Sequence, residues 1–153
     1  MMWDRRKLLV SLAMVTAAAA SRGVQAQAPG DTMPPMPGML PGAMTVESCI
    51  ESCWQSHAMC LRTERYCIES GGMHVMPAHL ALLADCAEMC EKTANTMLRR
   101  SRQHAAVCIA CAQLCDACAG DCEAFKDDAR MLACARSCRT CAGHCREMSR
   151  LPI

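Results

Sequence analysis

The sequence has few of the side chains that usually fill a protein core. Aromatic residues make up only 3% of its 153 residues. Val, Ile, Leu and Phe are also sparse in the part of the chain that follows residue 26. Burying one Leu or Phe side chain contributes about 1.5–3 kcal/mol, so most small domains depend on them. A chain of this length forms one domain by default, and its core therefore needs another kind of filling.

The sequence also lacks a strong charge and the usual catalytic motifs. Sixteen Lys and Arg residues oppose fifteen Asp and Glu residues, which gives a formal net charge of +1. This balance offers no bulk electrostatic attraction to nucleic acid or to an anionic membrane surface. No nucleophile–base pattern, paired carboxylate site or phosphate-binding loop is visible in the sequence. We therefore expect that the protein is not an enzyme.

What the sequence has in abundance is sulfur, with 15 Cys and 14 Met. Such a share of Cys is typical of a disulfide scaffold or of a metal-binding protein. The Cys count is odd, so the cysteines cannot all be paired within one chain.

Residues 1–26 are predicted to be an export signal peptide. The basic pair Arg5-Arg6 precedes an apolar run over residues 8–20, and small residues place the cleavage site near Ala26 or Ala28. The run is too short and too rich in Ala for a good membrane span, although a retained N-terminal anchor is the alternative. The Arg pair resembles a twin-arginine signal, which exports folded proteins. We expect an exported, periplasmic protein in a bacterium, where disulfides are permitted.

Residues 27–44 are predicted to be a flexible linker. Five Pro and three Gly fall in this stretch, a density that neither a helix nor a strand tolerates. Four Met residues are scattered through it and are either incidental or a thioether site that attracts Cu(I). These are Met33, Met36, Met39 and Met44.

The rest of the chain, residues 45–149, is predicted to be all-α. Ala, Met, Leu, Glu and Arg dominate, and β-branched residues are few, which favours helices. Gly71-Gly72, Pro77 and the Asp127-Asp128 pair are typical of helix ends and starts. Short links between long helices imply an antiparallel, up-down-up-down four-helix bundle. The expected helices are Thr45–Ser70, Pro77 to about Arg100, about Arg102 to Phe125, and Asp127 or Asp128 to about Ser149.

Every Cys lies on one face of its predicted helix, because the spacing between inward positions alternates between four and three. We therefore predict a bundle with a Cys-lined core. The Cys rows are Cys49, Cys53, Cys60 and Cys67; Cys86 and Cys90; Cys108, Cys111, Cys115, Cys118 and Cys122; and Cys134, Cys138, Cys141 and Cys145. Other residues share the same rows: Ser56, Thr63, Ser70, Met76, His79, Leu83, Thr93, Met97, His104, Phe125, Met131 and Met148.

Three kinds of cysteine chemistry other than copper binding could stabilise such a core: disulfides, structural zinc and iron–sulfur clusters. Disulfides between helices are geometrically allowed, but disulfide scaffolds mostly serve small, loop-rich domains. Structural zinc prefers separate sites with four ligands, whereas these cysteines form continuous rows. Iron–sulfur clusters usually take Cys from loops, whereas these cysteines lie within helices. All three remain alternatives.

Cu(I) fits the pattern better because it is soft and prefers thiolate and thioether ligands. Residues four apart on a helix are neighbours on one face, so two such thiolates can hold one ion. Six CxxxC pairs exist: Cys49/Cys53, Cys86/Cys90, Cys111/Cys115, Cys118/Cys122, Cys134/Cys138 and Cys141/Cys145. If each thiolate bridges two ions, the capacity is roughly one Cu(I) per Cys, which indicates storage or sequestration.

The CxxxC pairs within a four-helix pattern resemble the copper storage proteins. The segments Cys108–Cys122 and Cys134–Cys145 carry the resemblance most clearly, and it spans about residues 45–149. The resemblance implies a thiolate-lined bundle that holds many Cu(I) ions, supplies copper, and assembles as a homotetramer. It also implies export by a twin-arginine signal, and His and Met ligands at one open end.

The open end is predicted at the turn between the first two helices. That turn contains Met73, His74, Met76 and His79, and Met131 at the start of the fourth helix lies at the same end. We therefore add Met73, Met76, His79 and Met131 to the fifteen Cys as candidate metal ligands. Packing of Met76 and Met131 as core caps is the alternative, and the opposite end offers Met97, His104 and Met148. We expect His57 and His144 at the surface or its boundary, and Trp54, Tyr66 and Phe125 in packing.

Overall fold

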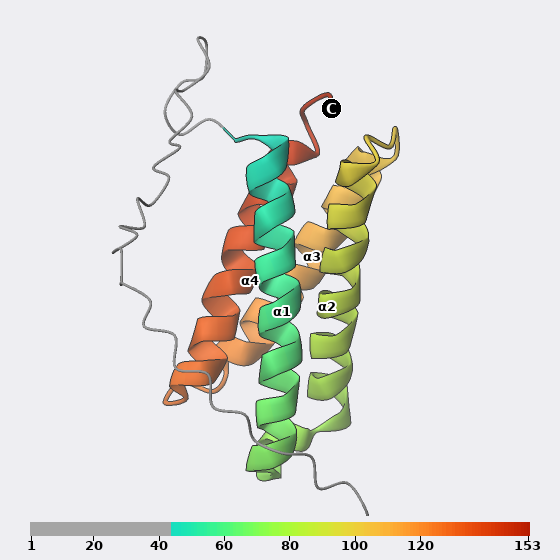
Figure 1. Ribbon diagram of the computed structural model, residues 1–153. Coiled ribbons are helices and arrows are strands. Elements are labelled where there is room, and N and C mark those ends of the chain that lie inside the picture. Colours follow the sequence, from blue (N-terminus) through green and yellow to red (C-terminus); the bar gives the residue numbers. More distant parts are fainter. Residues whose placement is uncertain (1–43) are drawn as a thin grey trace, which may run out of the picture. The chain divides into compact units, whose positions relative to one another are not determined.

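The computed structural model describes residues 44–153, and no strand is present among them. The predicted signal peptide and all of the predicted linker except Met44 lie outside the described residues. Four α-helices and one short 3₁₀ turn follow one another along the chain (Figure 1). They are α1 (Val46–Ser70), η1 (Gly72–Val75), α2 (Pro77–Leu98), α3 (His104–Glu123) and α4 (Ala129–Met148). The all-α prediction is confirmed.

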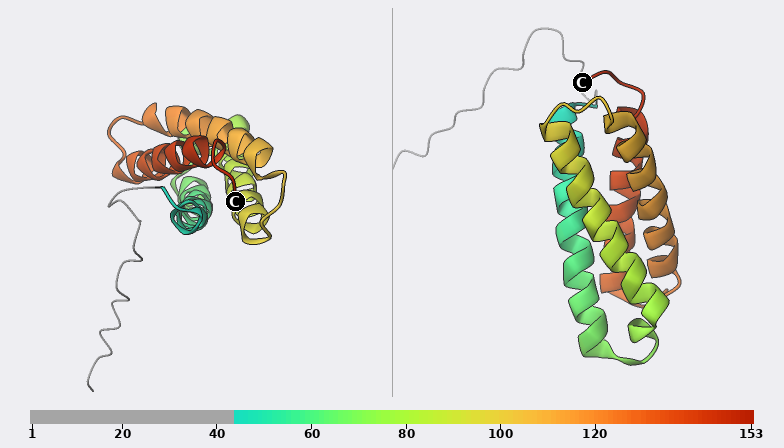
Figure 2. Two further views of the ribbon diagram at one scale, coloured as in Figure 1. Left: turned by 90° about the horizontal axis from the view of Figure 1, so that it is seen from above. Right: turned by 90° about the vertical axis from the view of Figure 1, so that its right-hand side faces the viewer.

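Each helix packs against two neighbours, so the four helices surround a common axis (Figure 2, left). α1 contacts α2 and α4, and α3 contacts the same two helices. The short connections force consecutive helices to run antiparallel, which confirms the predicted up-down-up-down bundle. We call the end with the α1–α2 and α3–α4 connections the turn end. The terminal end carries the start of α1, the α2–α3 connection and the C-terminus.

Local side-chain chemistry sets the helix boundaries. The hydroxyl of Thr45 accepts the N–H of Ser48 at 3.0 Å, and the Ser48 hydroxyl accepts the N–H of Thr45 at 3.0 Å. This reciprocal capping box satisfies two amide groups that have no partner within α1. At the other end of α1, Gly71 has φ = 69°, a left-handed conformation that glycine adopts readily. Pro77 begins α2, as predicted.

Of the two predicted caps for the fourth helix, Asp128 is the one used. Its Oδ1 accepts the N–H groups of Arg130 at 2.9 Å and of Met131 at 3.2 Å. Its Oδ2 accepts the Tyr66 hydroxyl at 2.7 Å and faces His74 Nε2 at 2.9 Å. Asp128 therefore ties α1 and the α1–α2 turn to the start of α4.

The core consists of small side chains and sulfur. All fifteen Cys are at most 1% exposed, as predicted from the rows. Leu83 is the single fully buried Leu among the described residues, and Met97, Met131 and Met148 are the other large apolar side chains of the core. Six Ala residues fill the space between the rows: Ala87, Ala94, Ala112, Ala119, Ala135 and Ala142.

The predicted rows are wrong at the helix ends. Ser70 and Met76 are exposed, and His104 and Phe125 are only half-buried. Ser70 is the last residue of α1, while Met76 and Phe125 lie just outside α2 and α3. These positions lie at or just beyond the helix ends, so the periodicity continues in the sequence past the fully packed part of the bundle.

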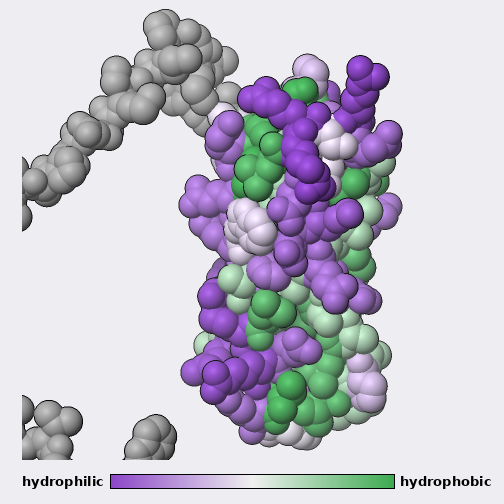
Figure 3. Space-filling view, turned by 45° about the vertical axis from the view of Figure 1, so that its right-hand side comes forward, coloured by the Kyte–Doolittle hydropathy of each residue, from purple (hydrophilic) through white to green (hydrophobic). Residues whose placement is uncertain are grey.

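The outer faces are mostly polar. Figure 3 shows hydrophilic side chains across one face of the bundle with apolar patches between them. Arg139 of α4 pairs with Asp116 at 3.0 Å and with Glu123 at 2.8 Å, both on α3. Because these charges are exposed, such pairs contribute little to stability. α3 is long and apolar enough to cross a membrane, yet it supplies seven buried residues to this core.

Replacing Asp128 by Ala should lower the free energy of unfolding of the reduced, copper-free protein by about 2 kcal/mol at pH 7. The change removes the α4 cap and the acceptor for Tyr66, each worth about 1 kcal/mol. Urea unfolding followed by circular dichroism measures this. The neighbouring Asp127→Ala is the matched control, because Asp127 is exposed and its loss should change stability by less than about 0.5 kcal/mol. Equal losses in the two variants would contradict the capping role.

The difference between the wild type and Asp128→Ala should also depend on pH. Burial opposes ionisation of Asp128, but hydrogen bonds from Tyr66, Met131, His74 and Arg130 outweigh it and lower the pKa of Asp128 to about 2. Since the folded pKa lies below the unfolded value of about 3.9, the contribution is complete above pH ~4 and disappears as the pH falls through about 2. A difference that stays constant from pH 6 to pH 2 would contradict this assignment.

Candidate metal centre

The fifteen cysteine sulfurs form one continuous array along the bundle axis, which we call the thiol chamber. All are free thiols, and all four helices contribute to it. The closest pair is Cys90 and Cys115, whose Sγ atoms are 3.5 Å apart. Cys86 lies 3.6 Å from Cys115, and Cys60 lies 3.7 Å from Cys138, in both cases between Sγ atoms. Sulfur therefore contacts sulfur across helix boundaries along the chamber.

Contacts between helices outnumber those within the CxxxC pairs. Within one helix, Cys111 and Cys115 have Sγ atoms 3.9 Å apart, as the spacing predicted. Between helices, Cys53 of α1 lies 3.7 Å from Cys145 and 3.8 Å from Cys141, both on α4. The sequence indicates which cysteines point inward, but not which cysteines of different helices meet.

Four groups of sulfur atoms are compact enough to surround a single ion, with all members within 4.8 Å of one another. They are Cys53/Cys111/Cys141/Cys145, Cys60/Cys86/Cys118/Cys138, Cys90/Cys111/Cys115/Cys141 and Cys118/Cys122/Cys134. Cys111, Cys141 and Cys118 each belong to two groups. Because each Cys has one sulfur, filling all four groups at once requires bridging thiolates. Separate tetrahedral sites of the structural zinc type do not share ligands in this way.

The thiols share protons through their contacts. Hydrogen bonds, first from Cys115, lower the pKa of both Cys111 and Cys138. The pKa of Cys115 is raised, chiefly through its hydrogen bond with Cys111. One thiolate can therefore be stabilised where several thiols donate to it, but neighbouring sites then resist ionisation. Only a bound cation allows many buried thiolates at once, because it replaces the protons that must leave.

A mixed group of ligand atoms lies at the turn end. Cys67 Sγ is 3.4 Å from His79 Nε2 and 3.7 Å from Met131 Sδ, and we call these three residues the turn-end triad. His79 is 5% exposed. Burial, with the nearby carboxylates of Asp128 and Glu64, raises the pKa of Cys67 to about 11. At neutral pH this thiol therefore keeps its proton unless a bound cation replaces it.

The structure brings together only part of the predicted entrance set. His79 and Met131 meet Cys67, whereas the side chains of Met73 and Met76 are 69% and 48% exposed. Met73 lies in η1, and Met76 precedes Pro77, so neither belongs to a helix face that looks into the chamber. These two methionines lie on the outer surface of the turn end.

Aromatic rings cover the turn-end triad. The Phe125 ring centroid is 4.5 Å from that of His74 and 5.1 Å from that of His79. His74 is held by Asp128, which Tyr66 also contacts. Tyr66 and Phe125 therefore pack, as expected.

The terminal end has a different chemistry. Met97 and Met148 are buried there, and Cys49 Sγ lies 3.9 Å from Cys145 Sγ. His104 Nε2 is 2.8 Å from the carbonyl oxygen of Leu151, so this ring binds the C-terminal segment. Met44 Sδ accepts the Ser48 hydroxyl at 3.2 Å. At the terminal end, thioethers therefore lie next to the chamber, and His104 contacts a backbone carbonyl rather than a thiol.

The two histidines predicted to lie at the boundary are both half-buried. His57 Nδ1 is 3.0 Å from the carbonyl oxygen of Ala87 and links α1 to α2. His144 Nδ1 is buried and has no hydrogen-bond partner among the described residues. Neither belongs to the compact groups of ligand atoms.

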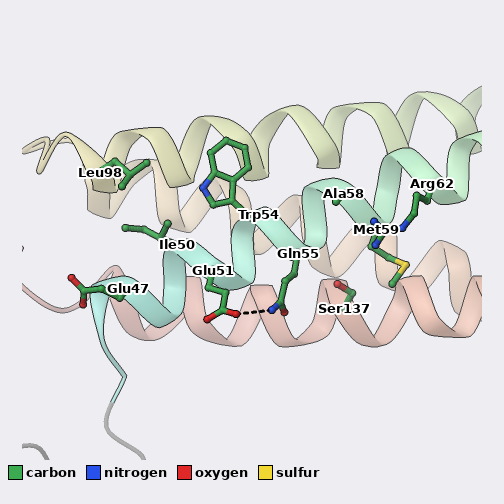
Figure 4. A pocket seen from close by; sticks show the side chains of 10 residues that line it. All are labelled: Glu47, Ile50, Glu51, Trp54, Gln55, Ala58, Met59, Arg62, Leu98 and Ser137. Carbon is green, nitrogen blue, oxygen red and sulfur yellow. Dashed lines mark hydrogen bonds between the residues drawn. The ribbon is translucent and has the colours of Figure 1, made fainter. Parts of the chain in front are cut away.

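A surface groove follows α1 on the outside of the bundle, with a volume of about 790 Å³. Figure 4 shows Ile50 and Trp54 of α1 with Leu98 of α2 on one side, and Ser137 of α4 on the other. Gln55 donates to Glu51 at 3.0 Å along the same helix. No Cys lines this groove. The metal-binding chemistry is therefore inside the bundle and separate from this groove.

Two polar residues in contact with candidate ligands were not predicted. The Ser56 hydroxyl donates to Cys138 Sγ over 3.6 Å, which favours negative charge on that sulfur. Asp121 Oδ2 makes a short contact with His79 Nδ1. The Ser56 contact was accessible to sequence reasoning, because Ser56 lies in the Cys row of α1. Asp121 and His79 lie 42 residues apart on different helices, and no spacing connects them.

Comparison with known proteins gives consistent relatives. Residues 43–150 match the family model described as copper storage protein. The chain is 42% identical to the Nmul_A1745 protein of Nitrosospira multiformis, with a TM-score of 0.64 over 69% of this chain and 94% of that one. It is 32% identical to Cu(I)-bound copper storage protein BsCsp3, with a TM-score of 0.64 over 67% of this chain and 96% of that one.

Two further relatives come from Bacillus subtilis. The apo form of copper storage protein 3 is 31% identical, with a TM-score of 0.63 over 69% of this chain and 99% of that one. The uncharacterized cysteine-rich protein YhjQ is 32% identical over 76 residues, which cover 50% of this chain and 70% of the relative. With a family model that spans the whole bundle, the chain belongs to the copper storage protein family.

Proposed function

We propose that this protein stores Cu(I) ions inside the thiol chamber and does not catalyse a reaction. The observation that carries the proposal is the overlap of the compact Cys groups, which share Cys111, Cys118 and Cys141. Shared sulfurs suit a soft cation that accepts two or three thiolates and allows each thiolate to bridge. Family membership and the Cu(I)-bound relative point the same way.

The capacity follows from the bridging. If each thiolate contacts two ions and each ion two thiolates, fifteen Cys hold roughly fifteen Cu(I) ions. This is many more than an electron-transfer or catalytic site needs. His79 and Met131 add ligands at the turn end through their contacts with Cys67. Met73 and Met76 are exposed outside the chamber, where they suit capture of copper rather than storage.

The setting of the protein is part of the same proposal. The Arg5-Arg6 pair and the apolar run support export by a twin-arginine route, with cleavage near Ala26 or Ala28. The mature protein then works in the periplasm as a homotetramer, and residues 27–44 form a Met-containing linker before the bundle. Export of a folded chain would protect the thiols, which are all buried in the bundle.

Anaerobic titration of the reduced protein with Cu(I), against a chromophoric chelator of known affinity, should reach at least ten ions per chain. The thiolates can hold roughly fifteen, and imperfect bridging reduces this number. Bound Cu(I) should be colourless in visible light, and loading should release protons because thiols must ionise. Saturation at one or two ions, or brown protein as isolated, would overturn storage in favour of a zinc or iron–sulfur site. Fewer than three free thiols in fresh protein would instead indicate a disulfide-stapled bundle.

The double variant Cys118→Ala/Cys122→Ala should lose a few Cu(I) ions per chain and keep its helical circular dichroism. These residues contribute two of the three sulfurs in one compact group, and Cys118 also belongs to a second. The matched control is Ala117→Ser/Glu123→Ala, which changes two exposed positions of the same helix. An unchanged capacity in the Cys variant, or an equal loss in the control, would contradict the assignment.

A further inference from the structure

The short contact between Asp121 and His79 fixes more than the packing of α2 against α3. A carboxylate only accepts hydrogen bonds, so the Nδ1 that faces Asp121 Oδ2 must carry the hydrogen. In the neutral ring the Nε2 lone pair is then free, and it faces Cys67 Sγ at 3.4 Å. The opposite tautomer would point an N–H group at the sulfur and leave no lone pair for a metal.

We propose that Asp121 is a positioning residue that holds His79 in the tautomer and orientation needed to bind Cu(I) together with Cys67 and Met131. The inference rests on the proposed storage function and deepens it at one ion. Carboxylates that accept the second ring N–H of a metal-binding His orient the ring and make it a better ligand. In the part of the chain that the structure describes, no other His contacts both a carboxylate and a thiol.

Burial makes the arrangement directional. His79 is 5% exposed, whereas the Asp121 side chain is 43% exposed. The carboxylate therefore keeps contact with water and stays outside the chamber. The imidazole links it to the interior, because one ring nitrogen faces Asp121 and the other faces Cys67. Phe125 packs against the His79 ring at 5.1 Å between centroids and limits its rotation. A ring held by one aromatic contact and one carboxylate needs little reorganisation when a metal arrives.

The alternative is that Asp121 only contributes an ion pair between helices. Asp116 provides the matched control, because it also lies on α3 and pairs with Arg139 and Arg146 of the next helix, away from His79. Removing either carboxylate costs one partly exposed interaction between helices, so the two variants should lose similar, small amounts of stability. Only removal of Asp121 should change the tautomer and the orientation of the His79 ring.

The first test measures the His79 tautomer in the copper-free, reduced protein labelled with ¹⁵N. Long-range ¹H–¹⁵N correlation spectra should show a single tautomer with hydrogen on Nδ1 in the wild type and in Asp116→Ala. Asp121→Ala should show a mixture of the two tautomers, with its helical content preserved. The Nε2–H tautomer in the wild type, or an unchanged spectrum in Asp121→Ala, would overturn the proposal.

The second test measures the affinity at this site. Loaded protein is titrated with bathocuproine disulfonate, and release is followed on the His79 ring nitrogens. Asp121→Ala should release the ion at a chelator concentration about 10–100-fold lower than the wild type requires, as is common when such a partner is lost. Asp116→Ala should match the wild type. Equal behaviour of the two variants would show a structural role only.

A variant pair checks that Asp121 acts through His79. His79→Ala should retain about one Cu(I) fewer than the wild type at a fixed chelator concentration, because one ion loses its imidazole ligand. Adding Asp121→Ala to His79→Ala should then cause no further loss, and an additive loss would refute the proposal. If the wild type binds many Cu(I) ions but Asp121→Ala and Asp116→Ala behave alike, storage stands and this inference fails. If the wild type binds one or two ions, the storage function itself fails.

Discussion

The structure depends on the burial of sulfur atoms that are in contact with one another. Each Cys occupies a position where a helical bundle normally places Leu or Phe, and each is at most 1% exposed. A neutral thiol packs as a small apolar group, but a thiolate in the same place needs a compensating charge. The chamber therefore has two compatible states, one filled with protons and one filled with soft cations. Packing holds the helices in the first state, and metal–sulfur bonds strengthen the second.

The exchange of thiol protons for soft cations explains why the core uses small side chains, which would stabilise an ordinary hydrophobic core poorly. Small side chains keep the four backbones close, so that sulfurs of different helices lie 3.5–4.0 Å apart. Larger side chains in the rows would push the helices apart. Leu83, on α2 between His79 and Cys86, is one of the few large side chains that are fully buried. The threonines that interrupt the rows bond to their own helix; Thr63, for example, donates to the carbonyl of Met59 at 2.9 Å. They fill space without competing for the thiols.

Much of this architecture follows from local rules, which is why the sequence predicts it. Alternating spacings of four and three place all fifteen Cys on inward faces, and Gly71, Pro77 and Asp128 mark the helix boundaries. Features that depend on the meeting of two helices cannot be predicted in this way. The pairing of Cys90 with Cys115 depends on how α2 and α3 pack, and so does the contact of Asp121 with His79. Met76 fits the periodicity yet is exposed, because the row extends beyond the end of its helix.

The two ends of the chamber differ in the ligand atoms that they offer. At the turn end, an imidazole and a thioether lie beside one thiol, whose pKa is raised. Deeper in the bundle, an ion meets three or four sulfurs at once. Neutral ligands hold Cu(I) less firmly than bridging thiolates, because they contribute no negative charge. In the proposed function, an ion that arrives at the turn end therefore moves inward towards stronger binding, and the first ions released are those held by the turn-end triad.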